Sequence, residues 1–177
     1  MEITTWYLEQ TTSDELLPAR PAPITVTRAE LVCPELNRFL YTAVGGDWHW
    51  TDRLSWTWQR WHDWLSRPRV ETWIAYLRGT PAGYVELDGA TRPDEVEIAY
   101  FGLVPPFVGK GIGGHLLTVA LRRAWELTDT RVWVHTCSLD GPAALANYQA
   151  RGMSLYRTEV ADEQVPEQSP GPWPGAR

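Results

Sequence analysis

The sequence predicts an α/β (α+β) fold, built as a mixed sheet with helices on both faces. Two segments with helical apolar spacing are followed by strand-like segments, and the chain then alternates strand, helix, strand, helix and strand. A glycine-rich turn joins an apolar run to an amphipathic run at residues 104–117. The chain has 177 residues with 44% apolar content, which is enough for one domain with a full core.

The first half of the chain contains two strand signals and two helix signals. Strands are expected at 3–8 and 24–26, joined by a proline-rich link. A helix is expected from Pro34, because its fixed φ suits a first helical position, and Gly45-Gly46 ends it. Residues 47–53 form a loop. A second helix is expected to be capped by Ser55 or Asp52, to end at Pro68 and to bury one face: Leu54, Trp58, Trp61 and Leu65.

The second half reads as strands and helices in alternation. Strands are expected at 70–77 and 83–87 around a turn at 79–81, and a polar hairpin at 88–94 leads to a central strand at 96–104. The remaining segments, in order, are a helix at 111–127, a strand at 131–137, a helix at 142–151 and a strand at 154–160. Gly152 ends the second of these helices.

The glycine-rich turn is the most informative motif. It removes side chains where a helix start presents free backbone N–H groups and a partial positive charge, so it predicts a phosphate cradle. A P-loop would need Gly-Lys-Ser/Thr, which is absent. A dinucleotide fingerprint is formally present as Gly109, Gly111 and Gly114, with Asp140 as a ribose-binding acid. That fingerprint normally opens its domain, however, whereas this turn comes late in the chain.

Residues 108–113 resemble the acyl-CoA-binding motif [Q/R]-x-x-G-x-[G/A] of the GNAT superfamily of N-acetyltransferases. Gly111 and Gly113 match its two small positions, whereas Val108 replaces the Gln or Arg. A second segment, 143–153, resembles the family's A-x-x-x-Y-x-x-x-G-F signature, with Tyr148 on the tyrosine and Met153 in place of Phe. The order of elements is also that of the family. The resemblance implies that strands 96–104 and 131–137 run parallel and splay apart around the pantetheine arm.

The resemblance further implies acetyl-CoA as co-substrate and a set of coenzyme-binding residues. Backbone amides of the turn are expected to hold the pyrophosphate, with Lys110 compensating in part for Val108. A backbone N–H near Leu103 is expected to stabilise the oxyanion if the strand bulges there. The implied coenzyme-binding residues are Leu103, Val104, Val108, Gly109, Lys110, Gly111, Ile112, Gly113, Gly114 and Asn147.

Two residues are expected to carry the chemistry. Glu97 matches the general base of some family members, and its apolar neighbours in the strand favour a desolvated carboxylate; a solvent-facing strand glutamate is the alternative. Tyr148 is the expected acid toward the departing thiolate, and a core tyrosine is the alternative. Glu86 and Glu95 are fallback bases. His135 on the strand after the phosphate helix either assists proton movement or is a structural histidine.

Acceptor-binding residues are expected in the tryptophan-rich region. Six of the eleven tryptophans lie between residues 48 and 64. Trp58 and Trp61 are expected to pack in the core, whereas Trp48, Trp50 and Asp47 are expected to line the acceptor pocket, with cation–π faces and a carboxylate for an ammonium. A packed loop or a dimer contact is the alternative. The predicted substrate-binding set is Asp47, Trp48, Trp50, Glu86 and His135.

The composition of the chain limits which kinds of partner and which location are expected for the protein. Net charge −6 argues against nucleic acid, and the absence of a long apolar run or a basic leader favours a cytoplasmic protein that does not bind membranes. Two cysteines and unclustered histidines predict no metal. Residues 1–161 are expected to form one acetyltransferase domain, monomeric or homodimeric, and 162–177 a disordered proline-rich tail.

The sequence therefore predicts an N-acetyltransferase that moves an acetyl group from acetyl-CoA to a primary amine through a ternary complex. The acceptor is expected to be a small molecule rather than a protein. A non-catalytic acyl-CoA sensor on the same fold is the alternative, because Val108 stands where the family has Gln or Arg. A nucleotide-dependent oxidoreductase that uses the glycine turn is a third reading.

Overall fold

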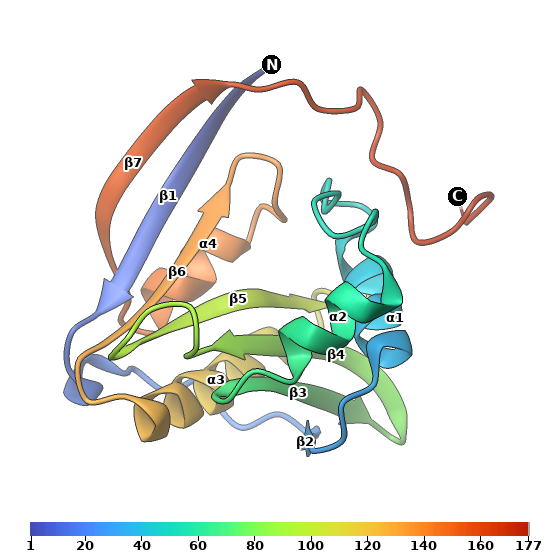
Figure 1. Cartoon of the computed structure of the whole chain (residues 1–177). Coiled ribbons are helices and arrows are strands. Elements are labelled where there is room, and N and C mark those ends of the chain that lie inside the picture. The colour runs from blue at the N-terminus through green and yellow to red at the C-terminus, as the bar shows by residue number, and fades with distance from the viewer. Residues whose placement is uncertain (177) are drawn as a thin grey trace.

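The computed structural model describes residues 1–176 and contains one seven-stranded mixed sheet (Figure 1). The strand order is β2-β3-β4-β5-β6-β1-β7. Every neighbouring pair is antiparallel except β5 and β6, which run parallel. The chain is therefore an α/β protein with the predicted mixed sheet.

The first half of the chain follows the predicted order, with longer strands and a shorter second helix than expected. The bounds are β1 Glu2–Gln10, the 3-10 turn η1 Ser13–Glu15, β2 Thr25–Ala29, α1 Pro34–Gly45 and α2 Trp58–Leu65. Two predictions about α2 are wrong. Its cap is Thr57, whose hydroxyl accepts from the Arg60 N–H, because the chain turns at 51–56 before the helix begins. Trp58, expected in the core, is 53% exposed at the start of the helix.

The sheet continues with β3 Val70–Leu77, β4 Thr80–Asp88 and β5 Glu95–Leu103. Alternate side chains of β4 point to opposite faces. Val85 and Leu87 pack in the core cluster under the helix α3 (Gly113–Leu127), while Tyr84 packs in the cluster under α1. Both faces of this central strand are therefore buried, as its apolar and aromatic composition requires.

The second half of the chain adds two helices on one face of the sheet, opposite α1 and α2 (Figure 1). Its elements are the 3-10 turn η2 Pro105–Phe107, α3 Gly113–Leu127, β6 Arg131–Cys137, α4 Ala144–Ala150 and β7 Ser154–Asp162. The face that packs on α3 supplies the larger cluster, which includes Leu116, Leu117 and Leu121. The opposite face packs on α1 and α2 through Leu40, Tyr41 and Trp61.

β5 and β6 separate partway along their length. Their parallel pairing joins Glu95 to Arg131, Val96 to Val132 and Glu97 to Trp133, and then it stops. Beyond Glu97, the rest of β5 pairs only with β4 on its other side. The predicted splay of the two central strands is thus present, and it opens the sheet beyond Glu97.

The segment after β7 crosses from one wall of this opening to the other (Figure 1). We call residues 163–172 the C-terminal strap. Its start is tied to the residue before β1, where the Glu163 N–H donates to the Met1 carbonyl at 2.9 Å. Its far end is tied to the end of α1, where the Gly171 N–H donates to the Gly46 carbonyl at 2.8 Å. Residues 163–176 form no helix or strand; disorder of this tail stays a prediction.

Candidate active site

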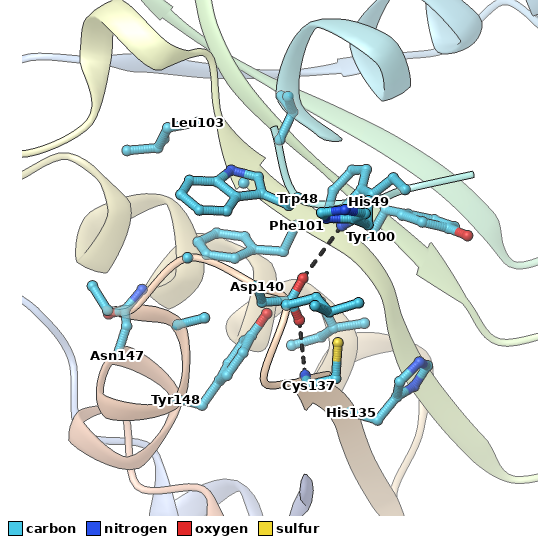
Figure 2. A pocket seen from close by; sticks show the side chains of 18 of the residues that line it. Trp48, His49, Tyr100, Phe101, Leu103, His135, Cys137, Asp140, Asn147 and Tyr148 are labelled. Carbon is cyan, nitrogen blue, oxygen red and sulfur yellow. Dashed lines mark hydrogen bonds between the residues drawn. The ribbon is translucent and has the colours of Figure 1, made fainter. Parts of the chain in front are cut away.

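A cavity of ≈ 1070 Å³ lies where β5 and β6 part, with side chains from several elements around it (Figure 2). Its walls come from β5, β6, the start of α3, α4, the loop after α1 and the strap. The predicted site residues among its lining are Trp48, Trp50, Glu97, Leu103, Val108, Gly109, Gly111, Gly113, Gly114, His135, Asn147 and Tyr148. The fold therefore gathers residues from positions 48 to 148 into one space.

The glycine turn forms one end of the cavity. Gly109 and Gly111 adopt φ values of 78° and 73°, which favour glycine, and a Cβ at either residue would point into open space. The N–H groups in the first turn of a helix have no intrahelical partners, and the following helix α3 has no side-chain cap to satisfy them. This combination of open backbone and uncapped helix start fits a phosphate group.

Three predicted coenzyme-binding residues lie outside the cavity lining. Val104 uses its N–H to pair with the Ala82 carbonyl at 2.9 Å, which continues the β4 ladder. Ile112 is only 1% exposed and packs inward. Lys110 is exposed, and its Nζ lies 5.5 Å from the centre of the Phe107 ring. Contacts of these residues with a coenzyme remain predictions.

Tyr148 lies on α4 with its ring buried and its hydroxyl directed into the cavity on the side of Asp140 (Figure 2). The ring packs 5.9 Å from Phe101. Burial, followed by the negative charge of Asp140, raises the pKa of Tyr148 well above its usual value near 10. Tyr148 is therefore a neutral phenol at physiological pH, and such a phenol can donate its proton to an anion.

Glu97 and His135 form a pair at the point where the strands separate. Glu97 is the last β5 residue paired with β6, and its Oε1 lies 3.3 Å from Nδ1 of His135. The Glu97 side chain is 20% exposed and that of His135 is 48% exposed. Its hydrogen bond to Glu97 raises the pKa of His135 against the lowering effect of burial. The predicted base thus lies beside a histidine whose imidazole can also carry a proton.

The irregularity in β5 falls at Ala99 rather than near Leu103. Leu87 pairs with Ile98 and Glu86 with Tyr100, so Ala99 is an extra residue in the ladder. The extra residue reverses the alternation: Val96 and Ile98 face α3 before it, and Phe101 and Leu103 do so after it. The predicted bulge position is therefore wrong by four residues, because the long-range pairing with β4 sets it.

The loop after α1 brings Trp48 and Trp50 to the cavity. Trp50 Nε1 donates to Asp140 Oδ1 at 3.4 Å, and its ring centre lies 4.9 Å from that of Tyr100. Asp140 also accepts from the Thr136 hydroxyl at 2.6 Å and from the Cys137 N–H at 3.0 Å. Sequence reasoning considered Asp140 only as a ribose-binding acid. It missed that Asp140 connects β6 with the loop that carries Trp48 and Trp50, which we call the tryptophan loop.

Glu86 lies behind the cavity wall in a buried ion pair. Arg53 Nη1 donates to both Glu86 oxygens at 2.9 and 3.0 Å, and the two side chains are 4% and 1% exposed. The Arg53 guanidinium packs over four aromatic rings, which are those of Trp56, Trp61, Trp64 and Tyr100. Glu86, predicted as an acceptor-binding residue and fallback base, is outside the lining, as is Asp47; their roles remain predictions.

Asp52 binds two tyrosines beside the aromatic rings that surround Arg53. Its Oδ1 accepts from the Tyr41 hydroxyl at 2.6 Å and its Oδ2 from the Tyr100 hydroxyl at 2.5 Å. Burial raises the pKa of both phenols, and the Asp52 carboxylate adds to the rise. No sequence motif marks this network, since it depends on α1, β5 and the loop at 47–57 meeting in space.

Within residues 1–176, no group of three or more His, Cys, Asp or Glu side chains is arranged to hold a metal ion. None of the helices in that range combines the length and apolar character that a bilayer crossing requires. The absence of a metal from the functional protein stays a prediction.

A sheet opened beyond Glu97, a glycine turn at a helix start and a tyrosine on the following helix together define an acyltransferase-like site. Residues 32–153, which are 122 of the 177, match the Acetyltransferase (GNAT) family. The chain belongs to that family. A comparison with curated proteins finds no match.

Solved structures with the same fold include GCN5-related N-acetyltransferases from Sphaerobacter thermophilus and Kribbella flavida. Their TM-scores are 0.67 and 0.64, at 17% and 21% identity over 89% of this chain. The chain spans only 50% and 56% of their respective lengths. The ribosomal-protein-S18-alanine N-acetyltransferase from Escherichia coli matches with a TM-score of 0.54 and 15% identity, over 73% of this chain and 76% of its own length. At these identities the likeness establishes the fold.

Proposed function

We propose that the protein transfers an acetyl group from acetyl-CoA to the primary amine of a small molecule, by direct attack in a ternary complex in the cytoplasm. The observation that carries the proposal is one shared cavity. The uncapped start of α3, the Tyr148 hydroxyl and the Glu97–His135 pair all border it. Binding, base and acid groups are therefore within one space.

The coenzyme would occupy the end of the cavity that the glycine turn forms. Gly109 to Gly114 offer backbone N–H groups and the positive end of a helix, which suit a pyrophosphate. Val108 is 54% exposed and supplies no charge, so this chain would hold the anion mainly through backbone groups. The bound thioester supplies an activated acyl carbon, and the residues of the chain supply orientation and proton transfer.

The reaction needs one group that takes a proton from the acceptor nitrogen and another that gives a proton to the departing thiolate. The acceptor nitrogen bonds to the acyl carbon as the carbon–sulfur bond breaks, and the nitrogen must lose one proton. The Glu97–His135 pair accepts that proton directly or through a water molecule. The departing thiolate takes its proton from the Tyr148 hydroxyl, which borders the same cavity and is a neutral phenol at physiological pH. The products are an N-acyl amine and free thiol.

A non-catalytic sensor of acyl-CoA is the second candidate, because Val108 replaces a phosphate-contacting side chain. Two measurements separate the candidates. Calorimetry with acetyl-CoA, CoA, NAD and ATP tests the coenzyme, and preferential binding of NAD or ATP would overturn the acyl-CoA assignment. Thiol release from acetyl-CoA across a panel of small amines tests catalysis, and binding without release would favour the sensor.

Tyr148→Phe tests the acid. We expect kcat to fall about 10²-fold while the acetyl-CoA Kd stays within about twofold, because only the hydroxyl is lost. Tyr156→Phe is the matched control, since Tyr156 lies on β7 outside the cavity and is 40% exposed. Equal turnover in the two variants would remove Tyr148 from the mechanism.

A further inference from the structure

We propose that the C-terminal strap is the outer wall of the acceptor pocket and that it restricts the acceptor to a small free amine. This inference rests on the proposed acyl transfer. The strap runs from the end of β7 to the end of α1 (Figure 1). Two of its residues, Glu163 and Val165, are part of the cavity lining together with Glu97, His135 and Trp48.

The strap is attached through specific contacts at its far end. The Gly46 carbonyl accepts from the Gly171 N–H and also from the Ser169 hydroxyl. Ser169 Oγ in turn accepts from the His49 N–H at 3.3 Å, and His49 Nε2 lies 3.1 Å from the Pro166 carbonyl oxygen. These contacts all involve the loop that carries Trp48 and Trp50, so the strap and the tryptophan loop form one continuous wall.

Close packing supports the same attachment. A Cβ on Gly46 would lie 2.5 Å from the Pro172 nitrogen and 2.6 Å from the Gly171 carbonyl carbon. Because Gly46 has no side chain, the strap backbone can approach the end of α1 more closely than it could if another residue stood at this position. Gly171 itself adopts φ 70°, which turns the chain so that its N–H faces Gly46. Both glycines are required by this contact.

The charges that face the cavity favour a cationic acceptor. Glu163 from the strap joins Asp52, Glu97 and Asp140 in the lining. Among the basic side chains of the same lining, Arg53 is paired with Glu86 and His135 with Glu97, while His49 Nε2 contacts the Pro166 carbonyl oxygen. An ammonium entering beside Trp48 and Trp50 would meet carboxylates and aromatic faces. A peptide chain that extends from the reacting amine would collide with the strap.

The experiment compares two proline substitutions in the same segment. Gly171→Pro removes the N–H that Gly46 accepts and cannot adopt φ 70°, so it should release the strap. Gly175→Pro is the matched control: Gly175 also has a positive φ, 79°, but a side chain there meets nothing within 4 Å. The two acceptors are Nα-acetyl-lysine amide and a 15-residue peptide that contains one lysine.

In the unmodified protein, we expect acetylation of the small amine to exceed that of the peptide. Gly171→Pro should lower this preference by about tenfold while sparing the acetyl-CoA KM, and Gly175→Pro should change neither. Hydrogen exchange at the amide of His49 reports strap release independently of activity. A released strap with unchanged preference would overturn the proposal. Absence of thiol release with every amine, in a protein whose His49 amide is protected, would instead refute the acyl transfer on which it rests.

Discussion

Replacing Glu86 by Gln should destabilise the fold without removing the catalytic base. Arg53 and Glu86 are 4% and 1% exposed, so the pair is separated from water. Glutamine keeps an acceptor for Trp64 Nε1, which donates to Glu86 Oε1 at 2.8 Å, but it removes the charge that compensates Arg53. The variant therefore buries an uncompensated guanidinium among aromatic rings.

The magnitude follows from the burial of the pair. Breaking a buried ion pair by removing one partner costs about 3–5 kcal/mol. Because the amide retains one hydrogen bond to Arg53 and the four aromatic rings still contact the cation, we expect the lower end, about 3 kcal/mol. For a chain of 177 residues this corresponds to a fall in Tm of about 6–12 °C.

Urea unfolding followed by tryptophan fluorescence measures the loss, with the linear extrapolation applied to each variant. The double variant Arg53→Met, Glu86→Leu should recover most of the stability, because it leaves no unpaired charge. A loss below about 1 kcal/mol for Glu86→Gln would match a solvated pair and refute the reasoning. Well below its Tm, the single variant should keep the pH–rate profile of the parent, unlike Glu97→Gln.

The remaining predictions concern the cavity. Val108→Arg should tighten acetyl-CoA binding about tenfold at low salt and steepen its salt dependence, as calorimetry at two salt concentrations would detect. Trp48→Ala should raise the acceptor KM about tenfold and spare the acetyl-CoA KM in steady-state kinetics. Glu97→Gln should lower the titration midpoint of His135 in an NMR titration, because the negative charge that strengthens its hydrogen bond and raises its pKa is removed.

Each of these outcomes has a control or a contrary result. Trp58→Ala, at an exposed residue outside the cavity, controls for Trp48→Ala. Weaker acetyl-CoA binding by Val108→Arg would exclude an anion at the turn.

Because the folded pKa of His135 is raised, its charged form stabilises the protein fully below about pH 6.5, and this stabilisation is lost as pH rises through the folded pKa. An unchanged midpoint in Glu97→Gln would mean that the pair is not formed in solution.

Local patterns in the sequence were sufficient to predict most of the elements. The helix from Pro34 and the strand Arg131–Cys137 appear as expected, because apolar spacing and terminal residues act within a few positions. The cap of α2 and the burial of Trp58 were wrong, since the turns at 51–56 shift the start of that helix. Such errors arise where tertiary contacts outweigh the local signal.

The site was predictable only where a motif marks it. The glycine turn, Glu97 and Tyr148 could be located from spacing and from the family resemblance, and all border one cavity. Asp140, Arg53 and the strap could not, because their positions depend on pairings between segments that lie far apart in the sequence. The place of Ala99 in β5 likewise depends on its register with β4.

The separation of β5 from β6 leaves a sheet edge inside the molecule rather than at its rim. Between Ile98 and Leu103, alternate backbone groups of β5 face the cavity instead of another strand. An extended ligand in this gap would act as a missing strand and supply partners for those groups. Occupancy and unfolding free energy are then linked, so that a ligand at 100 times its Kd adds about 2.7 kcal/mol. Thermal stability alone can therefore rank unknown ligands of this protein before any reaction is measured.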